Sequence, residues 1–313
     1  TYYQRTQQED TDKKSFHGLR DFYSLVKAIG RLNRPEKNDI MLAIARNFSG
    51  LPENFYIENG YRASERTFCC DVLNEKVDND DLHKVCSVVG LVQNNLSDKQ
   101  ARHLMLITQS DAAVSILKSQ LDVSDMEVMI GSRFSDDTGD EYNYRVLSKI
   151  ILCMETGRRL VLKGLDKIYG ALYDMLNQHY TNFGGNKNCR VALGADSNPL
   201  CQVHVNFRCI VLVDAEDLDH SDPPFLNRFE KQLLNYKDVL NPKQNRINKQ
   251  IENWSHETCE IQAKQTPWNR DLAFGAYPPS IFDGHIVPSL VLNYTDGGDE
   301  CASNCKRALF RIM

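Results

Sequence analysis

The stretch Ser221–Leu234, which reads Ser-Asp-Pro-Pro-Phe-Leu-Asn-Arg-Phe-Glu-Lys-Gln-Leu-Leu, follows a strongly apolar run at Phe207–Val213. A continuous aliphatic run of this kind is typical of a strand that is buried on both faces of a parallel sheet. The two prolines fix two φ angles and remove two backbone donors, so we expect the chain to turn here, with no helix crossing this point. The sequence therefore predicts a buried strand, an acidic loop, and an amphipathic segment that holds Arg228 just beyond a sheet edge.

Upstream of this strand, short apolar runs alternate with helical patterns from residue 99 onward. The apolar runs predict strands at Leu104–Ile107, Val128–Ile130 and Leu160–Leu162. The segments after them predict helices at Ala112–Leu121, Tyr144–Glu155 and Leu165–Tyr180, and a possible hairpin of Val191–Leu193 with Leu200–Val205. Strands that alternate with helices of about a dozen residues imply right-handed βαβ units. We therefore expect an α/β fold over residues 99–240, with a mainly parallel sheet and flanking helices.

The residues before this core divide into three segments. Residues 1–16 are polar and charged, which favours a flexible, disordered start. Residues 17–50 predict a helical subdomain of two helices, the first of which carries Leu19, Phe22, Tyr23, Val26 and Ile29 at helical spacing with its apolar face inward. The second runs over Glu36–Phe48 after Pro35. Residues 51–98 lack a sustained period and are interpreted as a linker with a short helix near His83–Val92.

The residues after the core, 241–313, predict a helical segment to about Glu260 and then an irregular tail rich in proline and glycine. Val287–Tyr294 fits either a strand or the start of a helix.

Composition excludes several classes of protein. The 313 residues carry a net charge of −5, which indicates neither a nucleic-acid partner nor an anionic membrane surface. No run reaches the ~18–20 apolar residues of a transmembrane segment. The ten cysteines include no Cys-x-x-Cys pair, and we expect reduced thiols, a cytoplasmic location and no metal site. The start Thr1-Tyr2-Tyr3 fits a fragment of a longer protein.

The phosphate-binding chemistry of nucleotide-hydrolysing α/β proteins is missing from the sequence. A phosphate loop needs glycines whose backbone N–H groups face the phosphates, and a lysine. The residues after the first strand, Thr108–Ala113, contain neither glycine nor lysine. Leu160–Leu162 is followed by Lys163 and Gly164 where a hydrolytic core would have an Asp-Glu pair, and Asp166 is expected at the start of the next helix. The unit at 99–240 is therefore predicted neither to bind nor to hydrolyse ATP by a phosphate-loop mechanism.

Four sequence blocks together resemble one family. They are residues 18–25 (GLRDFYSL) with 46–50 (RNFSG); 106–111 (LITQSD); 154–158 (METGR) through 168–178 (IYGALYDMLNQ); and 204–208 (HVNFR) through 223–231 (PPFLNRFEK). The blocks are similar to the mysterin family, giant ring-finger E3 ubiquitin-protein ligases that carry a tandem array of AAA+ units. The resemblance runs from about residue 17 to 240, and more faintly to Leu292.

The resemblance implies roles for each segment. Residues 17–50 resemble the helical lid of a preceding AAA+ unit, and Arg20 resembles a sensor-2 arginine that faces the nucleotide of that unit. Residues 99–240 resemble a degenerate AAA+ core, in which Arg228 is the candidate arginine finger acting in trans, with no catalytic residue acting in cis. ATP and Mg²⁺ are implied for neighbouring units, and zinc for the distant ring-finger module. The implied partners are adjacent AAA+ units of the same chain, a ubiquitin-conjugating enzyme and ubiquitin.

The residues leave alternatives open for both arginines and for the whole chain. Arg20 could instead pair on the helix surface with Asp21 or with an acid on the next turn, and Arg228 could lock the strand end by pairing with Glu230 or Asp222. The chain could also be an independent α/β binding or regulatory module with no nucleotide chemistry.

Overall fold

A computed structural model describes residues 16–51, 87–108, 112–119, 125–132, 134, 139–194, 197–265, 286–293 and 299–312. These residues form two compact units, one comprising those up to 109 and from 117 to 234, the other those from 110 to 116 and from 235 onward. The expected flexible start at 1–15, most of the expected linker, and residues 109–111 after the first strand lie outside the described residues.

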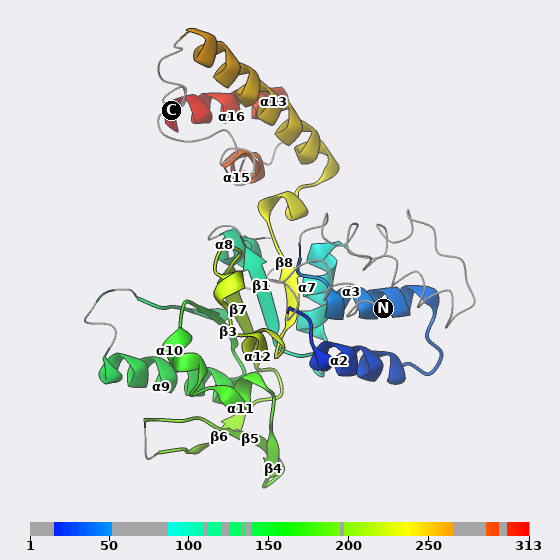
Figure 1. Ribbon diagram of the computed structural model, residues 1–313, viewed down its shortest axis with the longest axis vertical. Helices are drawn as coiled ribbons and strands as arrows, with labels where there is room; N and C mark the ends of the chain where they lie inside the picture. The colour runs from blue at the N-terminus through cyan, green and yellow to red at the C-terminus, as the bar shows by residue number, and fades with distance from the viewer. Residues whose placement is uncertain are drawn as a thin grey trace. The chain divides into compact units, whose positions relative to one another are not determined.

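The first unit is built on a five-stranded sheet in the order β2-β3-β7-β1-β8 (Figure 1). The strands are β1 (Leu104–Thr108), β2 (Met126–Ile130), β3 (Arg159–Lys163), β7 (Arg208–Asp214) and β8 (Glu230–Leu233). Every neighbouring pair is parallel. The α/β, AAA-like fold is therefore confirmed, and the carboxyl ends of all five strands meet at one edge of the sheet.

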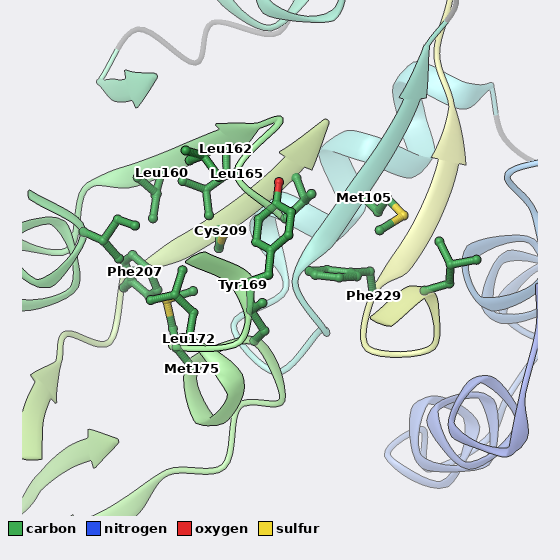
Figure 2. Close-up of a cluster of buried hydrophobic side chains, with 14 of the residues drawn as sticks. Met105, Leu160, Leu162, Leu165, Tyr169, Leu172, Met175, Phe207, Cys209 and Phe229 are labelled. Atoms are coloured by element: carbon green, nitrogen blue, oxygen red, sulfur yellow. The ribbon is translucent and has the colours of Figure 1, made fainter. Parts of the chain in front are cut away.

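The apolar runs form strands because each buries its side chains on both faces of the sheet. Leu104–Ile107 is at most 1% exposed, and Leu160, Val161 and Leu162 are fully buried. Figure 2 shows side chains of β1, β3 and β7, including Met105, Leu160 and Cys209, facing Tyr169, Leu172 and Met175 from the segment after β3. This packing fixes that segment against one face of the sheet.

The helices of this unit include α7 (Val88–Ser97) and α9 (Asp140–Thr156), whereas α8 (Ala112–Ser119) is divided between the two units after residue 116. The helix expected near His83–Val92 thus begins and ends later than predicted, and it packs against β1 and β8. α9 ends at Gly157, whose φ of 75° lies in the left-handed region that glycine adopts without strain.

The single helix predicted over Leu165–Tyr180 is wrong. The segment forms two short helices, α10 (Asp166–Tyr169) and α11 (Tyr173–Leu176). The carbonyl of Ala171 accepts a hydrogen bond from the N–H of Ala192 at 3.0 Å, so it is engaged outside the helix ladder. Asp166 begins α10, as predicted.

A second, antiparallel sheet lies between β3 and β7 in the sequence. It consists of β4 (Thr181–Phe183), β5 (Asn186–Arg190) and β6 (Leu200–Val203). The hairpin prediction was partly wrong, because the partner of β6 is Asn186–Arg190 and not Val191–Leu193. Gly184 and Gly185 both have positive φ and form the turn between β4 and β5.

The segment with the two prolines contains a short helix and a strand. η2 (Leu218–His220) is followed by α12 (Pro223–Leu226), whose first positions hold the prolines, since their missing N–H groups are unpaired there anyway. The chain then enters β8, a fifth core strand that the sequence did not predict. Its residues Glu230, Lys231 and Gln232 are polar and buried, so no apolar run marks it.

Within residues 16–51, the structure contains the helices α2 (Leu19–Gly30) and α3 (Lys37–Phe48), close to their predicted bounds. The orientation expected for α2 was wrong for four of its five apolar residues, whereas Ile29 packs against the core as predicted. Leu19, Phe22, Tyr23 and Val26 are 45–68% exposed, whereas Asp21 and Leu25 are buried. The polar contacts of Asp21, described below, turn this side of the helix inward.

Among its described residues from 235 onward, the second unit contains η3 (Tyr236–Val239) and the helices α13 (Pro242–Gln265), α15 (Val287–Asn293) and α16 (Asp299–Ile312). Its core includes Ile251, Val287, Val291, Cys305 and Leu309. Val287–Asn293 is helical, and the tail expected to be irregular ends in a helix. None of the helices in the described residues has the length and apolar character that a membrane crossing requires.

Candidate functional site

The carboxyl ends of β1, β3 and β7 are the place where an open parallel sheet binds its ligands. Here the last residues of these strands are Thr108, Lys163 and Asp214. The Nζ atom of Lys163 donates to Oδ1 of Asp214 at 3.0 Å. A lysine therefore stands where a hydrolytic core would have its metal-binding carboxylates, and its ammonium engages the carboxylate of the neighbouring strand.

Arg228 does not lie at the carboxyl ends of the strands. It lies between α12 and the amino-terminal end of β8. Its guanidinium carbon sits 4.6 Å from the centre of the Tyr173 ring and 5.9 Å from that of Phe225. Both distances are within the range of cation–π attraction. Arg228 is half-buried, and burial lowers the pKa of its guanidinium.

Arg20 is exposed on the first turn of α2, and its Nη1 donates a hydrogen bond to Oδ1 of Asn177. The positive charge of Arg20 also lowers the pKa of Arg228, after burial as the larger cause. The two arginines that the sequence singled out separately are therefore close in space. Their partners Tyr173 and Asn177 lie four residues apart at α11 and its carboxyl-terminal cap.

The start of α2 explains how Arg20 reaches this position. Gly18 caps the helix, and its N–H donates to Oδ2 of Asp21 at 2.7 Å. A side chain at Gly18 would meet the side-chain amide of Asn227 within 2.8 Å, so a larger residue there would force the side chain next to Arg228 to move.

Two of the carboxylates proposed as local partners of the two arginines, Asp21 and Glu230, form ion pairs with other cations. Asp21 contacts Arg102 at 2.8 Å and Lys231 at 3.1 Å. Glu230 contacts Arg46 at 2.9 Å. Asp222 is exposed and raises the pKa of Arg228 through its charge, without forming an ion pair. Within the described ranges, neither Arg20 nor Arg228 has a carboxylate at ion-pair distance.

A buried charged cluster, here defined as Asp21, Arg102 and Lys231, lies next to this pair. The side chains of Asp21 and Lys231 are fully buried, and that of Arg102 is 13% exposed. Although burial raises the pKa of Asp21, the charges of Lys231 and Arg102 outweigh it and hold that pKa below its usual value. Burial lowers the pKa of Lys231 to about 8 against the opposing effect of Asp21. The cluster joins α2 to β8.

The other buried polar residues of β8 form hydrogen bonds with residues of α3 and with Ser49, which follows it. Arg46 donates to both carboxylate oxygens of Glu230, at 2.9 and 3.0 Å. The side-chain oxygen of Gln232 accepts a hydrogen bond from the Ser49 hydroxyl at 2.7 Å, and its side-chain nitrogen donates one to the Arg46 carbonyl at 3.2 Å. These residues were not predicted from the sequence, because charged side chains in a short segment carry no signal of burial until their partners are known.

A family model described as the RNF213 AAA domain matches residues 93–240, which hold the parallel sheet, α11 and Arg228. The chain belongs to the RNF213, or mysterin, family. A mouse protein named E3 ubiquitin-protein ligase RNF213 is 33% identical over 80% of this chain, and a human protein of the same name is 30% identical over the same share. A zebrafish protein named E3 ubiquitin-protein ligase rnf213-beta is 31% identical over 80% of the chain.

The chain spans about 5% of the length of these curated relatives. Within the RNF213 family it therefore represents an AAA segment of a far longer protein architecture. Within the described residues, no group of three or more His, Cys, Asp or Glu side chains is arranged to hold a metal ion.

Proposed function

We propose that this chain is a non-hydrolysing AAA segment of an RNF213-like E3 ubiquitin-protein ligase. In this proposal it supports the ATPase array and the ligase scaffold, while ATP and Mg²⁺ are bound by neighbouring AAA units of the same chain. Zinc, the ubiquitin-conjugating enzyme and ubiquitin act at a ring-finger module elsewhere in the protein. The relatives named as E3 ubiquitin-protein ligases support the ligase part of this proposal.

The observation that carries the non-hydrolysing role is the ion pair of Lys163 and Asp214, with a separation of 3.0 Å. A magnesium nucleotide needs carboxylates or hydroxyls that face the ion and backbone N–H groups that face the phosphates. An ammonium at the end of β3 repels Mg²⁺ and engages Asp214. The absence of glycine and lysine from Thr108–Ala113 supports the same conclusion for the phosphates.

Isothermal titration of the 313-residue chain with Mg·ATP at submillimolar concentrations tests this role. We expect no saturable heat, in a sample whose folded state is verified by circular dichroism. A saturable, stoichiometric heat would overturn the proposal.

The second part of the proposal concerns Arg20 and Arg228. We propose that both face the nucleotide bound by the preceding AAA unit, Arg20 as a sensor-2 residue and Arg228 as an arginine finger. Two like charges held close together without a carboxylate on either favour an anion in the space that they face. A phosphate group in transfer is such an anion, and arginines stabilise the charge of its transition state.

The sequence encoded on either side of this segment in its gene distinguishes the proposed function from the alternative, an independent α/β regulatory module. The proposal requires a phosphate loop within the few hundred residues before this segment and a ring-finger Cys/His cluster after it. A gene that lacks both favours the independent module.

A further inference from the structure

The two arginines reach one surface because both are held by α11 and the residue that follows it. Tyr173, the first residue of α11, lies beneath the guanidinium of Arg228 at 4.6 Å. Asn177, the carboxyl-terminal cap, accepts a hydrogen bond from Arg20. Asn177 also donates to the carbonyl of Tyr173 at 2.9 Å, so the two supporting residues are fixed relative to each other.

The chain around α11 is anchored firmly enough to serve as a support. Leu172, Met175 and Leu176 are fully buried in the core beneath it. Gln178 adopts a φ of 54°, which is uncommon for a residue other than glycine, and its side-chain amide donates to the Ala101 carbonyl at 3.0 Å. The left-handed residue ends the helix, and its side chain ties that end to the chain just before β1.

The exposure of Tyr173 argues against a purely structural role for its side chain, and Asn177 is half-buried. Tyr173 is 51% exposed, and it covers no apolar core with its outer face. An exposed tyrosine contributes little to folding, yet its π face fixes the direction of Arg228. The side-chain oxygen of Asn177 accepts a hydrogen bond from the exposed Arg20 rather than from a group in the core.

We propose that Tyr173 and Asn177 are positioning residues that orient Arg228 and Arg20 toward a single polyphosphate. This inference rests on the proposed function of the two arginines and adds the residues that aim them. In this arrangement the core that lacks its own nucleotide site supplies the support for the site of the preceding unit.

The test uses ATP turnover of the full-length protein, which contains the preceding unit. Tyr173→Leu removes the π face, and Asn177→Ala removes the acceptor. Each is expected to lower kcat on the order of threefold to thirtyfold, the range of a lost cation–π contact or charge-assisted hydrogen bond. KM for ATP is expected to change by less than about twofold, because the arginines act mainly on the transition state. Tyr173→Phe and Tyr173→Trp keep the π face and are expected to keep kcat.

A control exists on α9, where the guanidinium of Arg145 lies 5.5 Å from the centre of the Tyr142 ring. Tyr142 is more buried than Tyr173 and packs against the core, so Tyr142→Leu removes a cation–π contact with at least as large an effect on folding, and it is expected to leave kcat unchanged. Melting temperatures of all variants exclude unfolding as the cause of a loss.

The possible failures separate the two ideas. If Arg228→Ala lowers kcat while Tyr173→Leu does not, the positioning inference is wrong and the role of the arginine stands. If Arg228→Ala and Arg20→Ala are both without effect, the proposed function itself fails. A loss in Tyr173→Phe as large as that in Tyr173→Leu would show that the hydroxyl matters rather than the ring, which contradicts the inference.

Discussion

Two pairs of charged residues lie close together in the sequence: Arg20 with Asp21, and Arg228 with Lys231 three positions later. In each pair one side chain is fully buried in an ion pair and the other is not. Asp21 and Lys231 are fully buried and contact each other at 3.1 Å, with Arg102 as a third member. Arg20 is exposed and Arg228 half-buried, and neither has a carboxylate at ion-pair distance within the described residues. The contrast teaches that this region uses some charges to hold α2 against β8, while two others have no carboxylate partner among the described residues, which is what the proposed anion site requires.

The largest effect expected from this contrast is on ATP turnover. In a protein that also contains the preceding AAA unit, Arg228→Ala should lower kcat by about 10³–10⁵, the range of a removed arginine finger. Steady-state ATPase measurement at saturating ATP checks it. Intact turnover together with a lower melting temperature would make Arg228 a structural residue and remove the contrast.

The next effect is on the free energy of unfolding. Asp21→Ala leaves Lys231 and Arg102 as uncompensated charges in the interior, which should lower that free energy by about 3–5 kcal/mol. Arg20→Ala, one position earlier, should lower it by less than about 1 kcal/mol, because the side chain is exposed. Urea denaturation of both variants measures the difference. Equal losses would mean that the two positions do not differ in the way described.

The same buried region should make stability depend on pH. Burial is the main cause that lowers the pKa of His17 and of His103 to about 3, and the charges of Lys231 and Arg208 add to it. Between pH 6.5 and 3 the unfolded chain binds protons that the folded chain rejects, so the stability present above pH 6.5 is lost as the pH falls. Each histidine contributes a slope of about 1.4 kcal/mol per pH unit.

Urea midpoints at several pH values over this interval measure the slope. Replacing His17 with Gln should reduce the slope by about 1.4 kcal/mol per pH unit, whatever it does to the absolute stability. A slope that does not change in this variant would contradict the assignment of His17 as a buried neutral group.

The smallest effect is expected at the carboxyl end of the sheet. The ion pair of Lys163 and Asp214 is partly exposed, with side chains 17% and 36% accessible, so Lys163→Met should lower the free energy of unfolding by about 1 kcal/mol or less. Thermal denaturation checks this, and a loss several times larger would mean that the pair is a main support of the sheet.

Much of the fold could be predicted from the sequence where burial and apolar character coincide. β7 follows from Phe207–Val213, and β1 and β3 from similar runs, because strands buried on both faces are usually near-continuous apolar runs. β8 could not be predicted in this way. Its Glu230, Lys231 and Gln232 are buried only because α2 and α3 supply partners more than 180 residues earlier in the chain.

The candidate site was predictable only as separate residues. Family resemblance picked out Arg20 and Arg228, but no local pattern places them side by side or names Tyr173 and Asn177 as their supports. The apolar spacing of α2 even indicated the wrong orientation, because the ion pairs of Asp21 determine which side of the helix faces the core. Long-range polar pairs of this kind leave no periodic signal in a sequence.

ATP turnover in a double-mutant cycle of Arg20→Ala and Arg228→Ala tests most directly whether the two arginines serve one anion. Residues that act as a unit on one transition state show losses that do not add. We therefore expect the double variant to lose about as much kcat as the more damaged single variant. Losses that multiply, so that the free-energy effects of the two changes simply add, would contradict a shared site.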